Sequence, residues 1–457
     1  MRVDDLSFLL QLFPALLTIY FIVVEAYTFA GVSERWSATG ATVILTAASA
    51  VVIARVPYGG WLLAVTALAY LASRISARLR QSARGVAADA LGALTITMVV
   101  SLFVYIRWHL PGRVFAWSGV TVITCHAIAY LVETARRRET ASPLLAGLYL
   151  WQFPVLPVGP IVRYDEFAPQ HLRLQSLVSL GAFAYGTRRI VIGVIKLWLI
   201  AGTLGETADA IFALPSSRLG TGAAWVGALS FSLQIYYLLS GYGDLAIGAG
   251  RVLGLRYPEN FRRPYVAESL RDFWTRWHMT ALAWARDYLS SPIVERQRLT
   301  PRAFLHVVIG FVFLGIWYGA TGNLLLWACY SAVCLALEAL WLGALIARLP
   351  RVARHLSLLA VLLAGWVILR TDTLAAAATF FQAMGGIHAP TAFPVWRFLT
   401  PAVWAALFVA VIGAGPMVPW ISRWRVTLDA ATTATVMMIG AVWVWLRRLL
   451  RAAVRRG

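Results

Sequence analysis

Residues 303–337 contain no Asp, Glu, Lys or Arg, and apolar stretches of similar character recur along the chain. A helix that crosses the hydrocarbon core of a bilayer needs about 20 mostly apolar residues. The sequence is 60% hydrophobic and only 13% charged, whereas soluble domains carry about 25% charged residues. So few charges cannot cover the surface of a soluble protein of 457 residues. We therefore predict an all-α protein that spans a membrane many times.

Stretches long enough to cross the bilayer, wholly or in part, are distributed over the whole chain. The candidate spans are residues 6–24, 37–54, 56–73, 90–106, 114–132, 144–158, 177–205, 219–243, 303–337, 355–369, 398–421 and 430–446. The stretch 303–337 is long enough for two helices hinged near residues 319–322. We expect about 11 to 13 transmembrane or re-entrant helices in one membrane domain over residues 1–457. Its N-terminal spans lie in 1–140 and its C-terminal spans in 398–446.

Basic residues cluster between the apolar stretches, and these clusters predict orientation. The net charge is +20, and all but one of the 40 basic residues are arginines. Arginines follow the third span (74–84), the fifth span (136–138) and the last span (447–456). Cytoplasmic loops carry an excess of Lys and Arg. We therefore expect a multi-pass membrane protein with its N-terminus outside and its C-terminus in the cytosol. The arginines are expected to contact lipid headgroups and no nucleic acid.

Histidines and cysteines give no sign of a metal site. The seven histidines show no H-x-x-x-H or H-E-x-x-H spacing, and the three cysteines lie inside apolar stretches without a C-x-x-C pair. Zinc sites normally show such spacings. The glycine-rich segment 241–250 lacks the G-K-[ST] ending of a phosphate-binding loop, which favours close helix packing through small residues. We expect no metal and no bound cofactor.

The segment 268–290 carries most of the groups that could perform chemistry. If it forms a single helix, Asp272 and Arg276 pair at four-residue spacing, and Trp274, His278 and Leu282 share one face. A histidine in such surroundings can carry protons because its ordinary pKa lies near neutrality. The alternative is a histidine that only forms hydrogen bonds at the membrane interface.

Four blocks of sequence resemble the membrane-bound O-acyltransferase (MBOAT) family. Their order and character are most similar to the bacterial branch that contains the alginate O-acetyltransferase membrane subunit and the teichoic-acid D-alanyl transfer protein. The blocks are residues 158–164, 240–248 continuing through 257–265, 272–280 with 284–288, and 315–323, with a weaker echo at 369–374. Together they define a motif core over residues 157–385.

The resemblance implies a many-helix fold around a central funnel. In that family an acyl thioester, here acetyl-CoA or an acyl-carrier protein, arrives from the cytosol and meets a hydroxyl acceptor from the other side. The implied activity is transfer of a short acyl group, acetyl in the first instance, to an exported polysaccharide or a periplasmic partner protein. A periplasmic SGNH-type acetyltransferase or a glycan-synthesis protein is the implied partner, with membrane lipid around the protein.

The resemblance also assigns site residues. The histidine of the family's R-W-H element corresponds to His278, and the histidine of its W-H-G element corresponds to Tyr318, so both are expected in the same funnel and to act in catalysis. The neighbouring motif residues are expected to bind substrate: Trp274, Arg276, Trp277, Asp287, Trp317 and Asn323.

Tyr318 is a departure from the family pattern that affects the mechanism. A phenol has an ordinary pKa near 10, so at neutral pH it donates hydrogen bonds and is a poor base. Three interpretations follow from the sequence. The chain is a non-catalytic member that scaffolds a polysaccharide-modification complex, or it uses His278 as base while Tyr318 binds the thioester carbonyl, or it is an inactivated variant.

Overall fold

The structure is a computed structural model, and it describes residues 34–55, 59–109, 118–137, 141–173, 179–289, 301–318, 323–387, 391–415 and 438. Within these ranges the chain forms helices joined by turns and short irregular segments, and no strand occurs. The predicted spans 6–24 and 430–446, the hinge 319–322 and the basic tail 447–456 lie outside the described residues.

Six described helical segments are long and apolar enough to cross a membrane, which makes the chain a multi-pass membrane protein. They are Gly59–Gln81, Gly85–Arg107, Gly181–Phe212, Thr221–Val252, Asn323–Ile346 and Arg351–Arg370. Shorter apolar helices cover Thr39–Ala50, Phe304–Tyr318, Leu374–Met384 and Pro401–Ala414.

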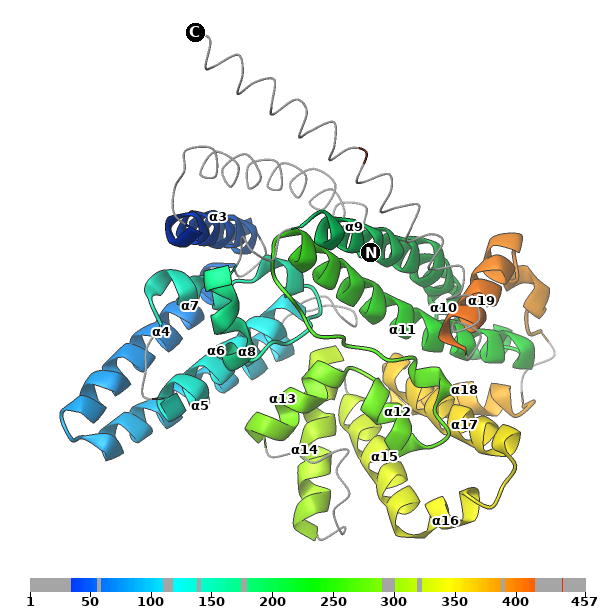
Figure 1. The fold of residues 1–457 in the computed structure, drawn as a ribbon. Coiled ribbons are helices and arrows are strands. Elements are labelled where there is room, and N and C mark those ends of the chain that lie inside the picture. Colours follow the sequence, from blue (N-terminus) through cyan, green and yellow to red (C-terminus); the bar gives the residue numbers. More distant parts are fainter. Residues whose placement is uncertain are drawn as a thin grey trace.

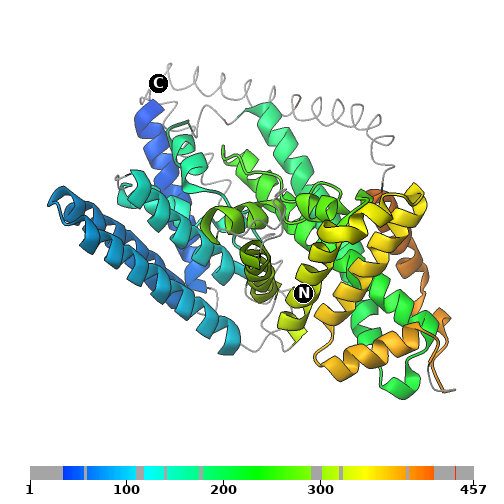
Figure 2. The same ribbon diagram turned by 90° about the horizontal axis from the view of Figure 1, so that it is seen from below.

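The N-terminal helices form a lobe at one edge of the molecule. It contains α3 (Glu34–Arg55), α4 (Gly59–Gln81), α5 (Gly85–His109) and α6 (Ser118–Arg137). Both views show α4 and α5 side by side, projecting from the rest of the protein (Figures 1 and 2). Large apolar side chains such as Leu71 on α4 and Leu94 on α5 are exposed. An exposed apolar surface of this kind is suited to contact with lipid.

The predicted span 144–158 is wrong. The structure has α7 (Pro143–Leu150), which is only eight residues long, followed by the 3-10 turn η2 (Phe153–Val155). Prolines 154, 157 and 160 interrupt the apolar run, and a proline has no backbone N–H to continue a helix. The chain then passes through α8 (Tyr164–Phe167) and η3 (Ala168–Arg173). This buried segment lies against the functional site and does not cross the membrane as one helix.

The longest helix pair is held together by glycines. The first partner consists of α9 (Leu180–Ile195), the π-helical turn η4 (Lys196–Gly202) and α10 (Thr203–Phe212), and the second is α11 (Thr221–Val252). A Cβ atom at Gly248 would lie 2.6 Å from the carbonyl oxygen of Gly186, and one at Gly193 would lie 2.8 Å from that of Gly241. Only glycine permits this approach, as predicted for the segment 241–250.

A buried ion network crosses the same helix interface. Asp244 of α11 lies 2.5 Å from Arg189 and 2.6 Å from Lys196, and Arg189 also binds Glu259 at 2.9 Å. Arg189 and Lys196 are two of the three charges that interrupt the apolar stretch 177–205, and the third is Arg188. Charged groups within membrane helices are expensive unless they are paired inside the bundle. Their pairing explains how the stretch remains a packed helix.

The C-terminal half occupies the lower and right-hand parts of the view in Figure 1, next to α11. It contains α12 (Leu270–Arg276), α13 (Met279–Leu289), α14 (Pro301–Tyr318), α15 (Asn323–Leu337), η7 (Glu338–Leu342), α16 (Gly343–Ile346), α17 (Arg351–Arg370), α18 (Leu374–Met384), η8 (Val395–Phe398) and α19 (Pro401–Ala414). The division of 303–337 into two helices is confirmed by α14 and α15. The carboxylate of Glu338 accepts hydrogen bonds from the backbone N–H groups of Leu270 and Arg271, at 2.7 and 3.1 Å. It therefore stabilises the positive end of α12.

Candidate active site

His278 does not lie inside a helix, and the predicted single helix over 268–290 is wrong. The structure has α12 and α13 with a break at Trp277 and His278. His278 has a φ of 46°, in the left-handed region, which few residues other than glycine, Asn and Asp adopt without cost. Its carbonyl oxygen accepts the N–H groups of Ala281 and Leu282 at 3.0 and 3.1 Å and thereby begins α13. Because α12 and α13 are separate helices on either side of this break, Trp274, His278 and Leu282 do not share one helical face.

Asn260 holds this break in place from a distant part of the chain. Its backbone carbonyl accepts the N–H of Met279 at 2.8 Å, and its Oδ1 accepts the N–H and the hydroxyl of Thr280 at 3.2 and 2.9 Å. The hydroxyl of Thr280 also accepts the N–H of Ile161 at 3.0 Å. Three blocks that resemble the family therefore meet at His278. The Nδ2 of this buried side chain has no hydrogen-bond partner among the described residues, so its contribution comes from Oδ1, whose loss would leave the buried donors of Thr280 unpaired.

The imidazole of His278 is fully buried in an aromatic box. It stacks on Phe261 with ring centroids 5.8 Å apart, and the ring of Trp317 meets it edge to face at 4.7 Å. The ring of Tyr318 lies nearly parallel to it at 6.2 Å. Aromatic walls exclude water and fix the direction of the ring nitrogens.

The only side-chain hydrogen bonds described within this box connect Trp277, Tyr318 and His278. The indole Nε1 of Trp277 donates to the hydroxyl oxygen of Tyr318 at 3.0 Å. The same oxygen lies 3.4 Å from Nδ1 of His278. Nε2 of His278 makes no hydrogen bond of good geometry with the described residues, although a contact with the backbone of Val158 acts on the ring and partly offsets the effect of burial on its pKa. One ring nitrogen therefore faces Tyr318.

Burial sets the protonation state of His278. Removal of the ring from water lowers the pKa of the imidazole to about 3, because burial penalises the charged form. The ring is therefore neutral near pH 7, and one of its nitrogens holds a lone pair that can accept a proton.

Arg107 is a site residue that the sequence analysis missed. It lies near the end of α5, is buried, and donates from Nε to the carbonyl oxygen of Ile316 and from Nη2 to that of Trp317, both at 3.0 Å. The last carbonyls of a helix have no partner within the helix. Arg107 therefore caps the end of α14 directly before Tyr318. The available signal was a single arginine that ends the apolar stretch 90–106.

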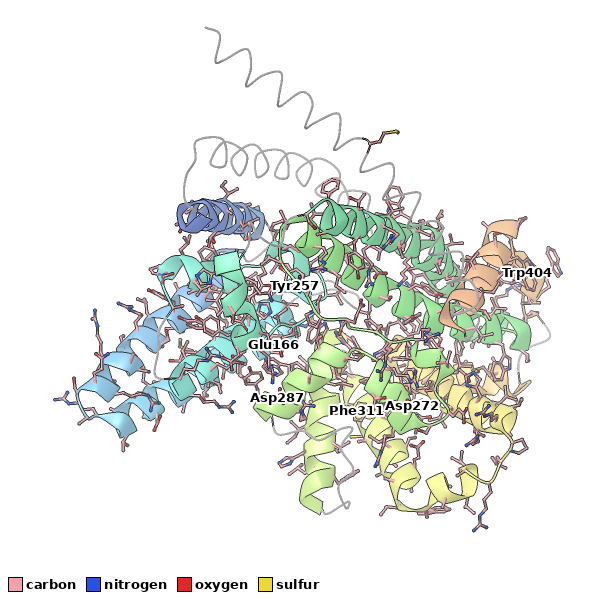
Figure 3. All side chains as sticks on the ribbon, in the orientation of Figure 1. Glu166, Tyr257, Asp272, Asp287, Phe311 and Trp404 are labelled. Carbon is pink, nitrogen blue, oxygen red and sulfur yellow. The ribbon has the colours of Figure 1, made fainter. Side chains whose placement is uncertain are left out.

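Trp277, Trp317 and Tyr318 are thus the predicted residues that the fold brings to His278. Four other predicted substrate-binding residues use their side chains elsewhere. Arg276 forms the predicted ion pair with Asp272 at 2.7 Å, and Asp287 binds Arg163 at 2.9 Å. Asp272 and Asp287 lie at opposite ends of the α12–α13 pair (Figure 3). The amide of Asn323 donates to the Thr371 carbonyl at 2.7 Å, and Trp274 packs edge to face on Phe311.

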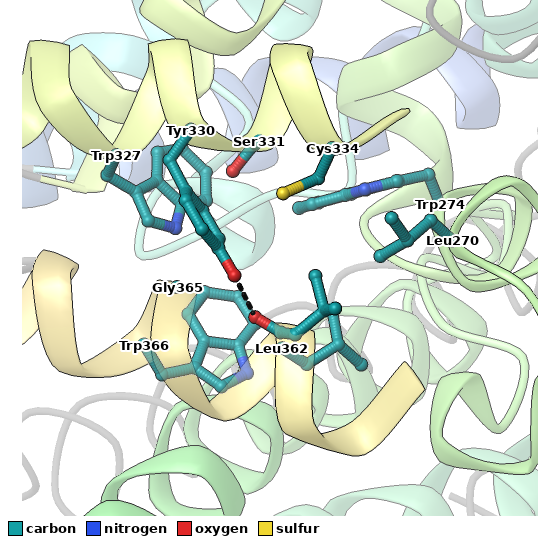
Figure 4. Close-up of a pocket in the computed structure, with 10 residues that line it drawn as sticks. Leu270, Trp274, Trp327, Tyr330, Ser331, Cys334, Leu362, Gly365 and Trp366 are labelled. Carbon is teal, nitrogen blue, oxygen red and sulfur yellow. Dashed lines mark hydrogen bonds between the residues drawn. The ribbon is translucent and has the colours of Figure 1, made fainter. Parts of the chain in front are cut away.

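A wall of tryptophans supports Tyr318 from the side of α15 and α17. Trp327 lies edge to face with Tyr318 at 5.7 Å and stacks on Trp366 at 6.1 Å. Both indoles also line a small pocket between α12, α15 and α17, where the hydroxyl of Tyr330 donates to the carbonyl of Val361 at 2.9 Å (Figure 4). The pocket volume of about 20 Å³ accommodates about one water molecule. This side of the site is therefore closely packed.

Comparison with known proteins identifies the family of the chain. The model of MBOAT, the membrane-bound O-acyltransferase family, matches residues 96–355, which is more than half of the chain. The chain belongs to this family. The matched region includes α11 through α15 and every residue of the aromatic box.

Individual relatives of this MBOAT chain act on bacterial glycopolymers according to their names. The chain is 32% identical over 299 residues to the probable alginate O-acetylase AlgI of Azotobacter vinelandii, which covers 65% of this chain and 58% of that protein. It is 25% identical over 346 residues to the peptidoglycan O-acetyltransferase of Helicobacter pylori (65% and 64%), and 26% identical over 239 residues to the teichoic acid D-alanyltransferase of Bacillus subtilis (49% and 59%). In each case the match spans less than two thirds of the relative.

Proposed function

We propose that this MBOAT chain is an O-acyltransferase that moves a short acyl group, most simply acetyl, from a cytosolic thioester to a hydroxyl group on the other side of the membrane. The donor is acetyl-CoA or an acyl-carrier protein. The acceptor is an exported polysaccharide or a serine of a periplasmic SGNH-type or glycan-synthesis partner. The names of the relatives support a glycopolymer acceptor.

The observation that carries this proposal is the order of hydrogen bonds from Trp277 through Tyr318 to His278. A phenol oxygen can accept two hydrogen bonds and donate one. Trp277 supplies the first, and Nδ1–H of His278 supplies the second when the ring is in that tautomer. Tyr318 then acts toward the substrate as a hydrogen-bond donor, and Nε2 of His278 keeps its lone pair. The 3.4 Å separation is loose, as is common in sites without substrate.

These groups allow a balanced transfer step. Nε2 of His278 accepts the proton of the acceptor hydroxyl as its oxygen forms a bond to the thioester carbonyl carbon. Tyr318 donates its phenol proton in a hydrogen bond to the carbonyl oxygen, on which negative charge develops. Collapse of the intermediate breaks the carbon–sulfur bond, and the imidazolium returns the proton to the leaving thiolate. The products are an ester and a free thiol.

The alternative is a non-catalytic member that scaffolds a polysaccharide-modification complex. The observation that favours it is the nature of residue 318, where the family has a histidine and this chain has a buried phenol held by Trp277. Under this alternative His278 is only a packed core residue. The two functions differ in whether substitution of His278 changes acylation.

The experiment is complementation of a strain that lacks the gene, followed by measurement of acyl groups on its exported glycan. His278→Asn is the preferred inactive variant, because Asn tolerates the left-handed backbone better than alanine does. We expect His278→Asn and His278→Ala to abolish acylation. His355→Ala is the matched control, because the ring of His355 lies 3.0 Å from the Ala267 carbonyl oxygen and His355 is not among the residues of the aromatic box.

Each outcome decides between the two functions. Full acylation by the wild type and none by His278→Asn, at equal protein level in the membrane, supports the transferase. If the wild-type protein restores the polysaccharide-modification complex but no acyl groups are added to the glycan, the scaffold function is supported. Acylation that survives His278→Asn would rule out His278 as the base.

A further inference from the structure

A cavity lies in the N-terminal lobe, outside the site described above. Its volume is about 440 Å³, and it occupies the space where the end of α4, the start of α5 and the end of α6 meet. At about 30 Å³ per water, this volume corresponds to roughly fifteen water molecules. It is partly open to the surroundings, unlike an enclosed packing void. The backbone beside it leaves room as well, since a Cβ atom at Gly92 would meet nothing within 4 Å.

The lining of this α4–α6 cavity is apolar along its walls and basic at one end. Ile96 and Leu131 contribute apolar wall, while Arg80 and Arg136 contribute positive charge. The acidic residue of the lining is Asp89, which is ion-paired with Arg80. The Nε atom of Arg80 is nevertheless buried without a hydrogen-bond partner in the described part of the chain. The cavity therefore presents a net positive charge and an unused buried donor.

The surroundings indicate what type of molecule fits. Leu71 and Ile75 on α4 and Leu94 on α5 are exposed on the outside of the same helices, so the cavity lies beside a surface suited to acyl chains. Arg78 and Arg84 are exposed near its basic end. Basic pockets between membrane helices on the cytosolic side bind anionic headgroups. A soluble phosphate compound would satisfy the arginines and leave the apolar walls unused.

We propose that the α4–α6 cavity binds an anionic phospholipid, with its phosphate at Arg80 and Arg136 and the start of an acyl chain along Gly92 and Ile96. This site is independent of the acyl-transfer site. It also fits the predicted cytosolic position of the arginine-rich turn after α4, where anionic lipids are attracted by basic residues.

The test uses the full-length protein, purified in a mild detergent and washed free of lipid. Phosphatidylglycerol or phosphatidylcholine with the same acyl chains is added, and bound lipid is counted by native mass spectrometry. We expect about tenfold stronger retention of phosphatidylglycerol, and about fivefold loss of that retention in Arg136→Gln. Gly92→Leu, which fills the cavity without a change in charge, should abolish retention.

Matched controls separate this site from general effects. Arg78→Gln removes an arginine from the same end outside the lining, and Gly60→Leu places leucine at another helical glycine with open space around it. Both should retain phosphatidylglycerol as the wild type does. Equal retention of the two lipids, or unchanged retention in Gly92→Leu, would overturn the proposal. Displacement of phosphatidylglycerol by coenzyme A, which then occupies the cavity, would assign it to a soluble phosphate instead.

Discussion

The indole N–H of Trp277 donates a hydrogen bond to the phenol oxygen of Tyr318 at 3.0 Å, although the two residues are 41 positions apart. Trp277 is adjacent to the histidine at the helix break, and Tyr318 ends α14. This bond therefore connects the proposed oxyanion donor, Tyr318, to the residue next to the proposed base, His278. In the proposed step, Trp277 itself contacts neither the thioester nor the acceptor hydroxyl.

The first prediction follows from that bond. Trp277→Phe keeps an aromatic ring but removes the N–H, and Tyr318→Phe removes the hydroxyl. Trp277→Phe should lower transfer about tenfold, because a buried hydrogen bond is lost, and Tyr318→Phe should lower it by about 10- to 1000-fold, because the oxyanion donor is lost. The double variant should be no slower than Tyr318→Phe, since Trp277 acts through the Tyr318 oxygen. The rate of thiol release from an acyl thioester is measured for the wild type, the two single variants and the double variant. The prediction is contradicted if the two single effects on the rate multiply in the double variant. Tyr330→Phe is a suitable control because the Tyr330 hydroxyl donates to the Val361 carbonyl and takes no part in the hydrogen bonds that connect Trp277, Tyr318 and His278.

Arg107 is predicted to be a positioning residue. Arg107→Met removes two donors from the end of α14 and also removes a buried charge, so the effects on the free energy of unfolding oppose one another. We expect transfer to fall about tenfold with little change in the amount of folded protein in the membrane. Arg107→Lys, which can still donate to one carbonyl, should recover part of the activity. The exposed Arg84→Gln should have no effect, and wild-type transfer by Arg107→Met would contradict this role.

Burial of His278 predicts an unusual dependence of transfer on pH. Because its pKa is lowered to about 3, the imidazole stays neutral and able to accept a proton throughout the range from about pH 5 to 8. Protonation would block it only at lower pH. The rate of single-turnover transfer by the purified protein should therefore not fall with a midpoint near pH 6.5 as the solution is acidified. A limb with a midpoint at the ordinary histidine pKa would show that the ring is solvated when it acts.

Orientation can be tested independently of chemistry. The arginines in 447–456 predict that the end of the chain is cytosolic. A green fluorescent protein fused after Gly457 should fluoresce, and alkaline phosphatase fused there should be inactive. The reverse pattern would invert the predicted orientation and, with it, the side from which the thioester donor arrives.

The local pattern of apolar residues predicted the long helices. It did not predict the backbone conformation where contacts with distant residues determine it. The apolar runs located α4, α11 and the α14–α15 pair, because length and hydropathy are local properties. Prolines in 144–158 overrode the same signal. The break at His278 was not predicted, because residues 268–290 alone have ordinary helical spacing. The hydrogen bonds that favour the break come from Asn260, outside that segment.

The candidate site was predictable only in part for the same reason. The resemblance to the family placed His278 and Tyr318 together, and their 3.4 Å separation confirms that they share one site. The catalytic roles of both residues stay predictions. Arg107 could not be placed from the sequence, because its bonds to α14 join residues more than 200 positions apart. A pattern within one helix carries no information on such a contact.

The measurement that tests the account most directly is acyl transfer from an acetyl thioester to a hydroxyl acceptor by the purified protein, compared between wild type, Tyr318→Phe and His278→Asn. Both the ester and the released thiol are counted. The account predicts transfer by the wild type, a reduction of about 10- to 1000-fold in Tyr318→Phe, and none in His278→Asn. Transfer by His278→Asn at the wild-type rate would contradict it, because the proposed base would then be dispensable.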